Sequence, residues 1–118
     1  MYEEVILSHY RNPHNKGTVS APTSSVHKSN PLCGDSITLS IVESDGIITD
    51  IAFEGEGCVI STAAASLLTD YAKGKKKEDL MKLDASFIID LLGIELGATR
   101  LKCALLPLEA LQVVCNSL

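Results

Sequence analysis

A stretch of alternating apolar and polar residues between positions 36 and 54 constrains the fold most strongly. A β-strand places successive side chains on opposite faces of its sheet, so this alternation predicts strands with one buried face. Two alternating runs flank Asp45-Gly46, a dipeptide that favours a tight hairpin turn. The stretch therefore predicts an antiparallel hairpin whose buried face is formed by Ile37, Leu39, Ile41, Ile47, Ile51 and Phe53.

Helical spacing of apolar residues occurs on both sides of the predicted hairpin. Residues 2–10 and residues 60–71 each repeat apolar side chains three or four positions apart, which is typical of one face of an α-helix. A proline after the first run and a glycine after the second predict where these helices end. Asp84 is placed to cap a further short helix, which we expect to end at Gly93.

The last predicted helix carries an apolar stripe and also a proline. Proline has no N–H to donate and fits an α-helix only in its first turn. We therefore expect this helix to begin near Cys103, shortly before Pro107. Cys115 lies in phase with the stripe and is expected in the core. The stripe consists of Leu101, Ala104, Leu105, Leu108 and Leu111.

The remaining segments complete an α+β interpretation. We expect residues 14–25 to form a loop, residues 26–29 a short edge strand and the lysines at 75–77 a solvated connection. Strands and helices are segregated along the chain, which predicts a small, about three-stranded antiparallel sheet covered by helices. The length predicts a single domain over residues 1–118.

Composition excludes several classes of function. The net charge of −5 argues against a nucleic-acid partner. No apolar run approaches the roughly 20 residues that span a bilayer, and the N-terminus resembles neither a signal nor a transit peptide. We therefore expect a cytoplasmic protein without a membrane partner. In such a reducing compartment, four cysteines indicate metal binding or reactive thiols more often than disulfides.

Three short segments each deliver one thiol. They are residues 30–35 (NPLCGD), 55–61 (GEGCVIS) and 100–104 (RLKCA), which contain Cys33, Cys58 and Cys103. Asp35 follows Cys33 after a single glycine and adds an oxygen ligand to the set. Three thiols and one carboxylate are a four-ligand set for zinc or for an iron–sulfur cluster.

The spacing of these thiols indicates an exchangeable site. No two of them form a Cys-x-x-Cys pair of the kind that zinc ribbons and ferredoxins use. The site must instead form by folding of the whole domain. Cys58 is predicted at a helix start and Cys103 at or just before another, and the positive end of a helix favours a thiolate.

The three motifs, together with residues 9–17 (HYRNPHNKG), resemble those of the U-type iron–sulfur cluster assembly scaffolds, the family of IscU, SufU and the N-terminal domain of NifU. The likeness runs from the first residues to the last helix. It implies the same α+β fold and a scaffold rather than an enzyme. Such a scaffold receives sulfur from a cysteine desulfurase of the IscS/SufS type, assembles a [2Fe–2S] cluster and passes it to apo iron–sulfur recipient proteins. The implied ligands are Cys33, Asp35, Cys58 and Cys103.

Within this family, Lys102 leaves two functions open. IscU-like members carry a histidine before the third cysteine, whereas SufU-like members carry a lysine, as here. The alternative is thus a SufU-like zinc-dependent sulfurtransferase, in which Zn²⁺ occupies the same ligands and the protein relays persulfide sulfur. The segment between Cys58 and Cys103 looks too short for the SufU insertion, which opposes this alternative. In either case we expect Cys103 to accept the sulfur and Lys102 to support its thiolate.

Some of these residues also suit other functions. Residues 96–100 (LGATR) replace the LPPVK motif of IscU-like proteins, so no dependence on an Hsc-type chaperone is expected. A purely structural zinc module does not call for an aspartate ligand, although Asp35 alone also suits a turn or a helix cap. A cysteine hydrolase would need a histidine beside Cys58 or Cys103. We instead expect His9 to be packed, and His14 and His27 to be solvated.

Overall fold

The computed structural model describes residues 2–31 and 34–118. Cys33, one of the predicted ligands, lies outside the described residues. Along the chain the elements are α1 (Tyr2–Arg11), β1 (Ser24–Asn30), β2 (Asp35–Ser44), β3 (Ile47–Glu54), α2 (Val59–Ala72), α3 (Lys77–Met81), α4 (Ala85–Leu92) and α5 (Ala98–Asn116).

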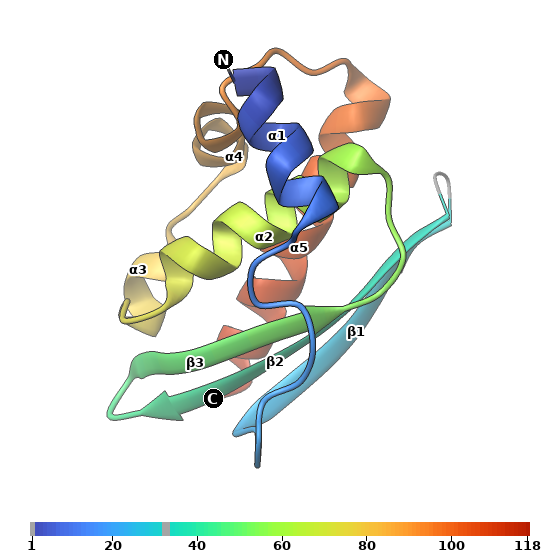
Figure 1. Ribbon diagram of the computed structural model, residues 1–118. Helices are drawn as coiled ribbons and strands as arrows, with labels where there is room; N and C mark the ends of the chain where they lie inside the picture. Colours follow the sequence, from blue (N-terminus) through green and yellow to red (C-terminus); the bar gives the residue numbers. More distant parts are fainter. Residues whose placement is uncertain (1, 32–33) are drawn as a thin grey trace.

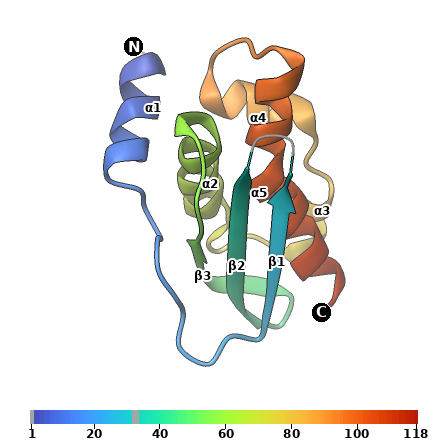
Figure 2. The same ribbon diagram turned by 90° about the vertical axis from the view of Figure 1, so that its right-hand side faces the viewer.

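The strands form one antiparallel sheet in the order β1-β2-β3. Helices α2 and α5 lie against the sheet, α5 over β1 and β2 and α2 over β3 (Figure 1). Helix α1 packs on α2 and stands apart from the sheet (Figure 2). The predicted α+β fold, a small antiparallel sheet covered by helices, is confirmed.

The hairpin of β2 and β3 closes where the sequence predicts it. Asp45 and Gly46 both have positive φ values, 53° and 81°, as tight hairpin turns require. The predicted buried face is confirmed along β2. On β3 the prediction is wrong at one position, because Ile48 is fully buried whereas Ile47 is only half-buried. The pairing shifts register between Val42 and Glu43, and this β-bulge changes which side chains of β3 face the core.

Strand β1 is longer than the predicted segment 26–29. It pairs with β2 in continuous register from Ser24 opposite Ile41 to Asn30 opposite Asp35. This ladder places Asp35 at the end of the sheet, where the chain enters β2. The strand is alternately exposed and half-buried, as an edge strand is expected to be.

Helix α4 is confirmed with both of its predicted ends. The Asp84 side chain accepts a hydrogen bond from the Phe87 backbone N–H at 3.1 Å. Gly93 ends the helix with a φ of 72°, the left-handed conformation that glycine adopts readily. The short helix α3 was not predicted: residue 77, in the run of lysines, begins it, and its Leu80 is fully buried.

The predicted start of the last helix is wrong. Helix α5 begins at Ala98, so Pro107 lies inside the helix and Cys103 lies in its second turn. Proline cannot donate to the carbonyl four residues earlier, which normally disfavours this position. Burial of Leu106, Pro107 and Leu108 against the rest of the fold offsets that loss. No helix in the described part of the chain is long and apolar enough to cross a membrane.

Candidate metal centre

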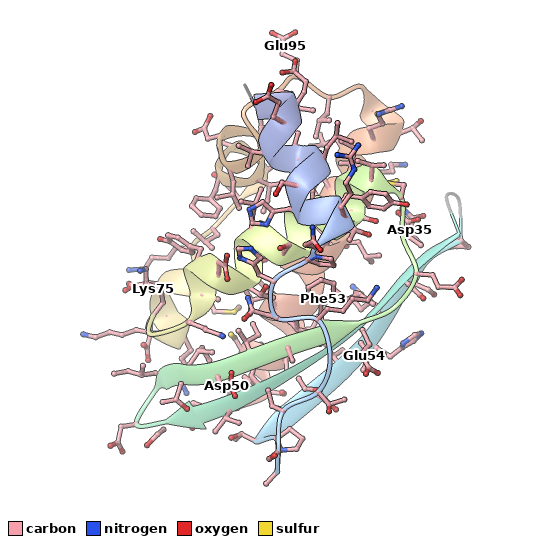
Figure 3. All side chains as sticks on the ribbon, viewed as in Figure 1. Asp35, Asp50, Phe53, Glu54, Lys75 and Glu95 are labelled. Atoms are coloured by element: carbon pink, nitrogen blue, oxygen red, sulfur yellow. The ribbon has the colours of Figure 1, made fainter. Side chains whose placement is uncertain are left out.

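Three of the four predicted ligands come together in space. One ligand atom each from Asp35, Cys58 and Cys103 lies within 4.8 Å of the others. Asp35 begins β2, Cys58 caps the start of α2 and Cys103 lies in the second turn of α5. Figure 3 shows Asp35 at the end of the sheet, close to where the chain enters α2. The segments are far apart in sequence, so only the folded chain creates this group, which we call the thiol cluster.

Asp35 is buried within the thiol cluster, with 4% of its surface exposed. Its Oδ1 accepts a hydrogen bond from the backbone N–H of Cys58 at 3.2 Å. Its buried Oδ2 has no hydrogen-bond partner among the described residues. A buried polar atom without a partner costs about 1–3 kcal/mol. A metal ion between Oδ2 and the two sulfurs would remove that cost.

Cys58 is the exposed member of the thiol cluster and the N-cap of α2. Its Sγ accepts a hydrogen bond from the Ser61 backbone N–H at 3.4 Å and donates to the Ser61 hydroxyl oxygen at 3.7 Å. The predicted position of Cys58 at a helix start is therefore confirmed. Ser61, the last residue of the GEGCVIS motif, orients this sulfur, a role that was not predicted from the sequence.

A close approach between two backbones brings Cys58 to Asp35. Gly55 has a φ of 143°, and a Cβ at this position would lie 2.1 Å from the carbonyl oxygen of Ser36. One residue later, the Glu56 carbonyl accepts a hydrogen bond from the Ser36 N–H at 2.7 Å. Only glycine allows the chain to lie this close to the start of β2.

Cys103 is buried, with 4% of its surface exposed. It was expected at or before a helix start, and that expectation is wrong because α5 begins five residues earlier, at Ala98. The favourable effect of a helix N-terminus on an anion fades within the first turn, so it does not extend to Cys103. Lys102 is exposed and lines a surface groove with Lys28, Asn30 and Pro31.

The chemistry of the thiol cluster fits a zinc ion or the iron of a cluster. Thiolate sulfur binds zinc and iron–sulfur clusters, and a carboxylate oxygen completes zinc sites as well. Two sulfurs and the Asp35 carboxyl group lie within reach of one ion. No histidine belongs to this cluster in the described part of the chain.

Cys115 lies outside the thiol cluster. As predicted, it is buried in the core, with 3% of its surface exposed. Burial raises the pKa of the Cys115 thiol to about 11, so this sulfur is a packed apolar group at neutral pH.

Cys115 is therefore expected to resist alkylation in the native protein. With a pKa of about 11, about one thiol in a thousand is a thiolate at pH 8, and the thiolate is the reactive form. Mass spectrometry after iodoacetamide treatment of metal-free protein should find Cys58 labelled and Cys115 unlabelled. The control is the same treatment in denaturant, where all four cysteines should react. Equal labelling of Cys58 and Cys115 in the native protein would contradict the burial argument.

The three histidines each form a hydrogen bond with another side chain. His9 is half-buried, as predicted, and its Nδ1 lies 2.6 Å from the Ser66 hydroxyl. His14 was expected to be solvated. Its side chain is 55% exposed, but its Nδ1 forms a hydrogen bond with Oδ2 of Asp70 at 2.5 Å. His27 is exposed and bonds to Thr38 within the sheet.

Comparisons with known proteins place the chain in a family. The model of the "NifU-like N terminal domain" family matches residues 1–117. The zinc-dependent sulfurtransferase SufU of Bacillus subtilis (strain 168) is 38% identical over 129 positions, which cover 95% of this chain and 87% of that protein. The iron–sulfur cluster assembly scaffold protein IscU of Haemophilus influenzae is 35% identical over 115 positions, covering 94% of this chain and 90% of the relative.

A solved structure agrees with these sequence matches. The crystal structure of a candidate iron–sulfur cluster assembly scaffold protein for the SUF system, from Fervidobacterium islandicum AW-1, superposes with a TM-score of 0.85 at 25% identity. The superposition covers 95% of this chain and 94% of that one. Family match, curated relatives and fold all agree, and the chain belongs to the NifU-like N-terminal domain family, together with the IscU and SufU proteins.

Proposed function

We propose that this protein is an iron–sulfur cluster assembly scaffold. It receives sulfur from a cysteine desulfurase of the IscS/SufS type, assembles a [2Fe–2S] cluster on Cys33, Asp35, Cys58 and Cys103, and transfers the cluster to apo iron–sulfur proteins. The observation that carries the proposal is the convergence of Asp35, Cys58 and Cys103, with one buried Asp35 oxygen left without a partner in the described chain. The IscU relatives support it.

The site suits a cluster that is handed on. Cys58 is exposed, so one edge of the thiol cluster is open to a recipient protein. Asp35 is the hard oxygen ligand among soft sulfurs and is the ligand most easily exchanged from iron. In transfer, the bond from iron to Asp35 breaks as a bond to a recipient thiolate forms, and the proton of the recipient thiol passes to solvent.

Cys103 remains the proposed sulfur acceptor, on the basis of the family resemblance. Its thiolate attacks the outer sulfur of the desulfurase persulfide, and the desulfurase leaves as a thiolate, so sulfur moves without net oxidation or reduction. Because Cys103 is buried, part of the surrounding chain must move aside when the desulfurase docks. The exposed Lys102, its neighbour in the chain, is proposed to support the attacking thiolate.

Lys102→Ala is accordingly expected to slow persulfide formation severalfold and to leave zinc affinity nearly unchanged. An ammonium group cannot coordinate a metal, but a cation near a thiol favours the thiolate. Desulfurase-coupled persulfide labelling and a zinc titration measure the two effects separately. Lys28→Ala is the matched control, since Lys28 lines the same groove. Loss of zinc binding with normal labelling would reverse the proposed role of Lys102.

The second candidate function is a zinc-dependent sulfurtransferase that relays sulfur without building a cluster. Lys102 and the SufU relative favour it. The length of the chain opposes it: the SufU alignment spans 129 positions, more than the 118 residues present here, so that relative contains residues without a counterpart. The alignment with the IscU relative spans 115 positions, fewer than the 118 residues of this chain.

One preparation distinguishes the two functions. Protein purified without oxygen is analysed for iron, zinc and acid-labile sulfide, and its visible spectrum is recorded. Brown protein that contains iron and sulfide supports the scaffold. Colourless protein with zinc in the thiol cluster, which accepts persulfide sulfur but builds no cluster when iron is supplied, supports the relay. We further propose that either function operates in the reducing cytoplasm without an Hsc-type chaperone.

A further inference from the structure

A second group of metal-ligating side chains lies at the junction of α1 and α2. Ligand atoms of His9, His14 and Asp70 lie within 4.8 Å of one another. His9 is near the end of α1, His14 follows in the segment after it, and Asp70 lies in the last turn of α2. The two imidazole rings are 4.5 Å apart between centroids and tilted by 45°. We call these three residues the histidine cluster.

A buried hydroxyl group holds both histidines in place. Ser66 is fully buried, and its Oγ lies 2.6 Å from Nδ1 of His9 and accepts a hydrogen bond from the His14 backbone N–H at 2.7 Å. Histidines that bind metals are commonly oriented in this way, by a hydrogen bond at the ring nitrogen that faces away from the ion. When Nδ1–H of His9 donates to the Ser66 hydroxyl oxygen, Nε2 of His9 carries the lone pair that a metal ion can bind.

The carboxyl group of Asp70 is also oriented. The Asn15 side chain donates to Oδ1 of Asp70 at 2.8 Å and to the Thr69 hydroxyl at 3.0 Å. Oδ2 then faces Nδ1 of His14. Each of the three candidate ligands is thus oriented by a hydrogen bond to another residue. A chance contact between surface side chains does not need such support.

The shifted pKa values of His9 and Asp70 favour the ionisation states that bind a cation. Burial lowers the pKa of His9, and the nearby His14 lowers it further against the opposing effect of Asp70, which favours the neutral imidazole that metals bind. Burial alone would raise the pKa of Asp70, but hydrogen bonds from His14 and Asn15 outweigh it and hold the pKa below its ordinary value. Two imidazoles and one carboxylate are a common ligand set for zinc and ferrous iron.

We infer that His9, His14 and Asp70 form a second metal site, which binds one divalent transition-metal ion such as Zn²⁺. The ion replaces the proton shared by His14 and Asp70, which is released to solvent, and solvent completes the coordination. The site is separate from the thiol cluster, because Asp70 and Cys58 are roughly 18 Å apart along α2 at about 1.5 Å per residue. We expect this ion to strengthen the attachment of α1 to the rest of the fold. Among the described side chains of α1, only Ile6 is buried, so α1 has little other anchorage.

The test uses the full-length protein with two different metals. One equivalent of Zn²⁺ first fills the thiol cluster, and Co²⁺ is then added, since Co²⁺ binds nitrogen and sulfur sites more weakly than Zn²⁺ and does not displace it readily. We expect a second equivalent to bind with the visible bands of nitrogen- and oxygen-bound Co²⁺ and without a near-ultraviolet thiolate-to-cobalt charge-transfer band. Binding of a single metal ion in total would overturn the inference.

Variants locate the second ion. His14→Ala and Asp70→Asn are each expected to weaken Co²⁺ binding by more than about tenfold, and Ser66→Ala by about 10–100-fold through lost orientation. His27→Ala is the matched control, because His27 is a histidine outside the cluster, and it should bind Co²⁺ like wild type. Unchanged zinc loading of the thiol cluster verifies that each variant is folded. Co²⁺ binding that survives both His14→Ala and Asp70→Asn would overturn the assignment.

Discussion

Gly55→Ala is expected to lower the free energy of unfolding by about 2–6 kcal/mol. The residue has a φ of 143°, a region that other residues rarely adopt and that costs about 1–3 kcal/mol. The added Cβ would also meet the Ser36 carbonyl oxygen at 2.1 Å and the Cα of Ile37 at 2.9 Å. These are backbone atoms of β2, which cannot rotate away as a side chain can, so overpacking adds a further cost of about 1–3 kcal/mol.

Gly46→Ala separates the two contributions. Gly46 also has a positive φ, 81°, but a Cβ there would meet nothing within 4 Å. It is therefore expected to cost only the backbone strain, about 1–2 kcal/mol. Urea unfolding of both variants measures the difference. Gly55→Ala should also weaken zinc binding, because the displaced segment carries Cys58. Similar losses of stability in the two variants would show that the close approach to Ser36 is unimportant.

Asp35→Asn is expected to have opposite effects on the metal-free and the metal-bound protein. Asparagine keeps an oxygen that accepts from the Cys58 N–H, now bonded at 3.2 Å, but it removes the negative charge that a metal ion would pair with. Zinc affinity should fall more than about a hundredfold, beyond what loss of a supporting residue causes. Without metal, the variant should be at least as stable as wild type, because a neutral amide costs less to bury than a charged carboxyl group and its Nδ2–H can donate to the nearby sulfurs of the thiol cluster.

Competition with a chromogenic chelator gives the zinc affinity, and thermal unfolding with excess chelator gives the metal-free stability. Asp50→Asn is the matched control, since Asp50 is an exposed aspartate of β3 outside the thiol cluster. A zinc affinity equal to wild type in Asp35→Asn would reduce Asp35 to a partner of the Cys58 N–H. If the protein is a scaffold, Asp35→Asn should also transfer a cluster to an apo-ferredoxin more slowly, because the exchangeable carboxylate ligand has been removed.

Local patterns in the sequence were sufficient for those features that depend on near neighbours. Asp45-Gly46 specifies its turn through the backbone angles that the two residues tolerate, and Asp84 and Gly93 delimit α4 through hydrogen bonds within one helical turn. The position of Cys58 at the start of α2 follows in the same way from the preceding glycines. The alternation along β2 identified its buried face because strand geometry relates every second residue.

Features that depend on distant contacts were decided only by the tertiary structure. Pro107 argued locally for a late start of α5, but packing of that helix against α2 and the sheet stabilises an earlier start at Ala98, and this buries Cys103 in the second turn. The bulge opposite Val42 changed which isoleucine of β3 is buried. The histidine cluster joins residues more than fifty positions apart through Ser66. Periodicity and capping describe the chain over one or two turns, whereas these outcomes depend on which surfaces meet when the chain folds, and that information is not local.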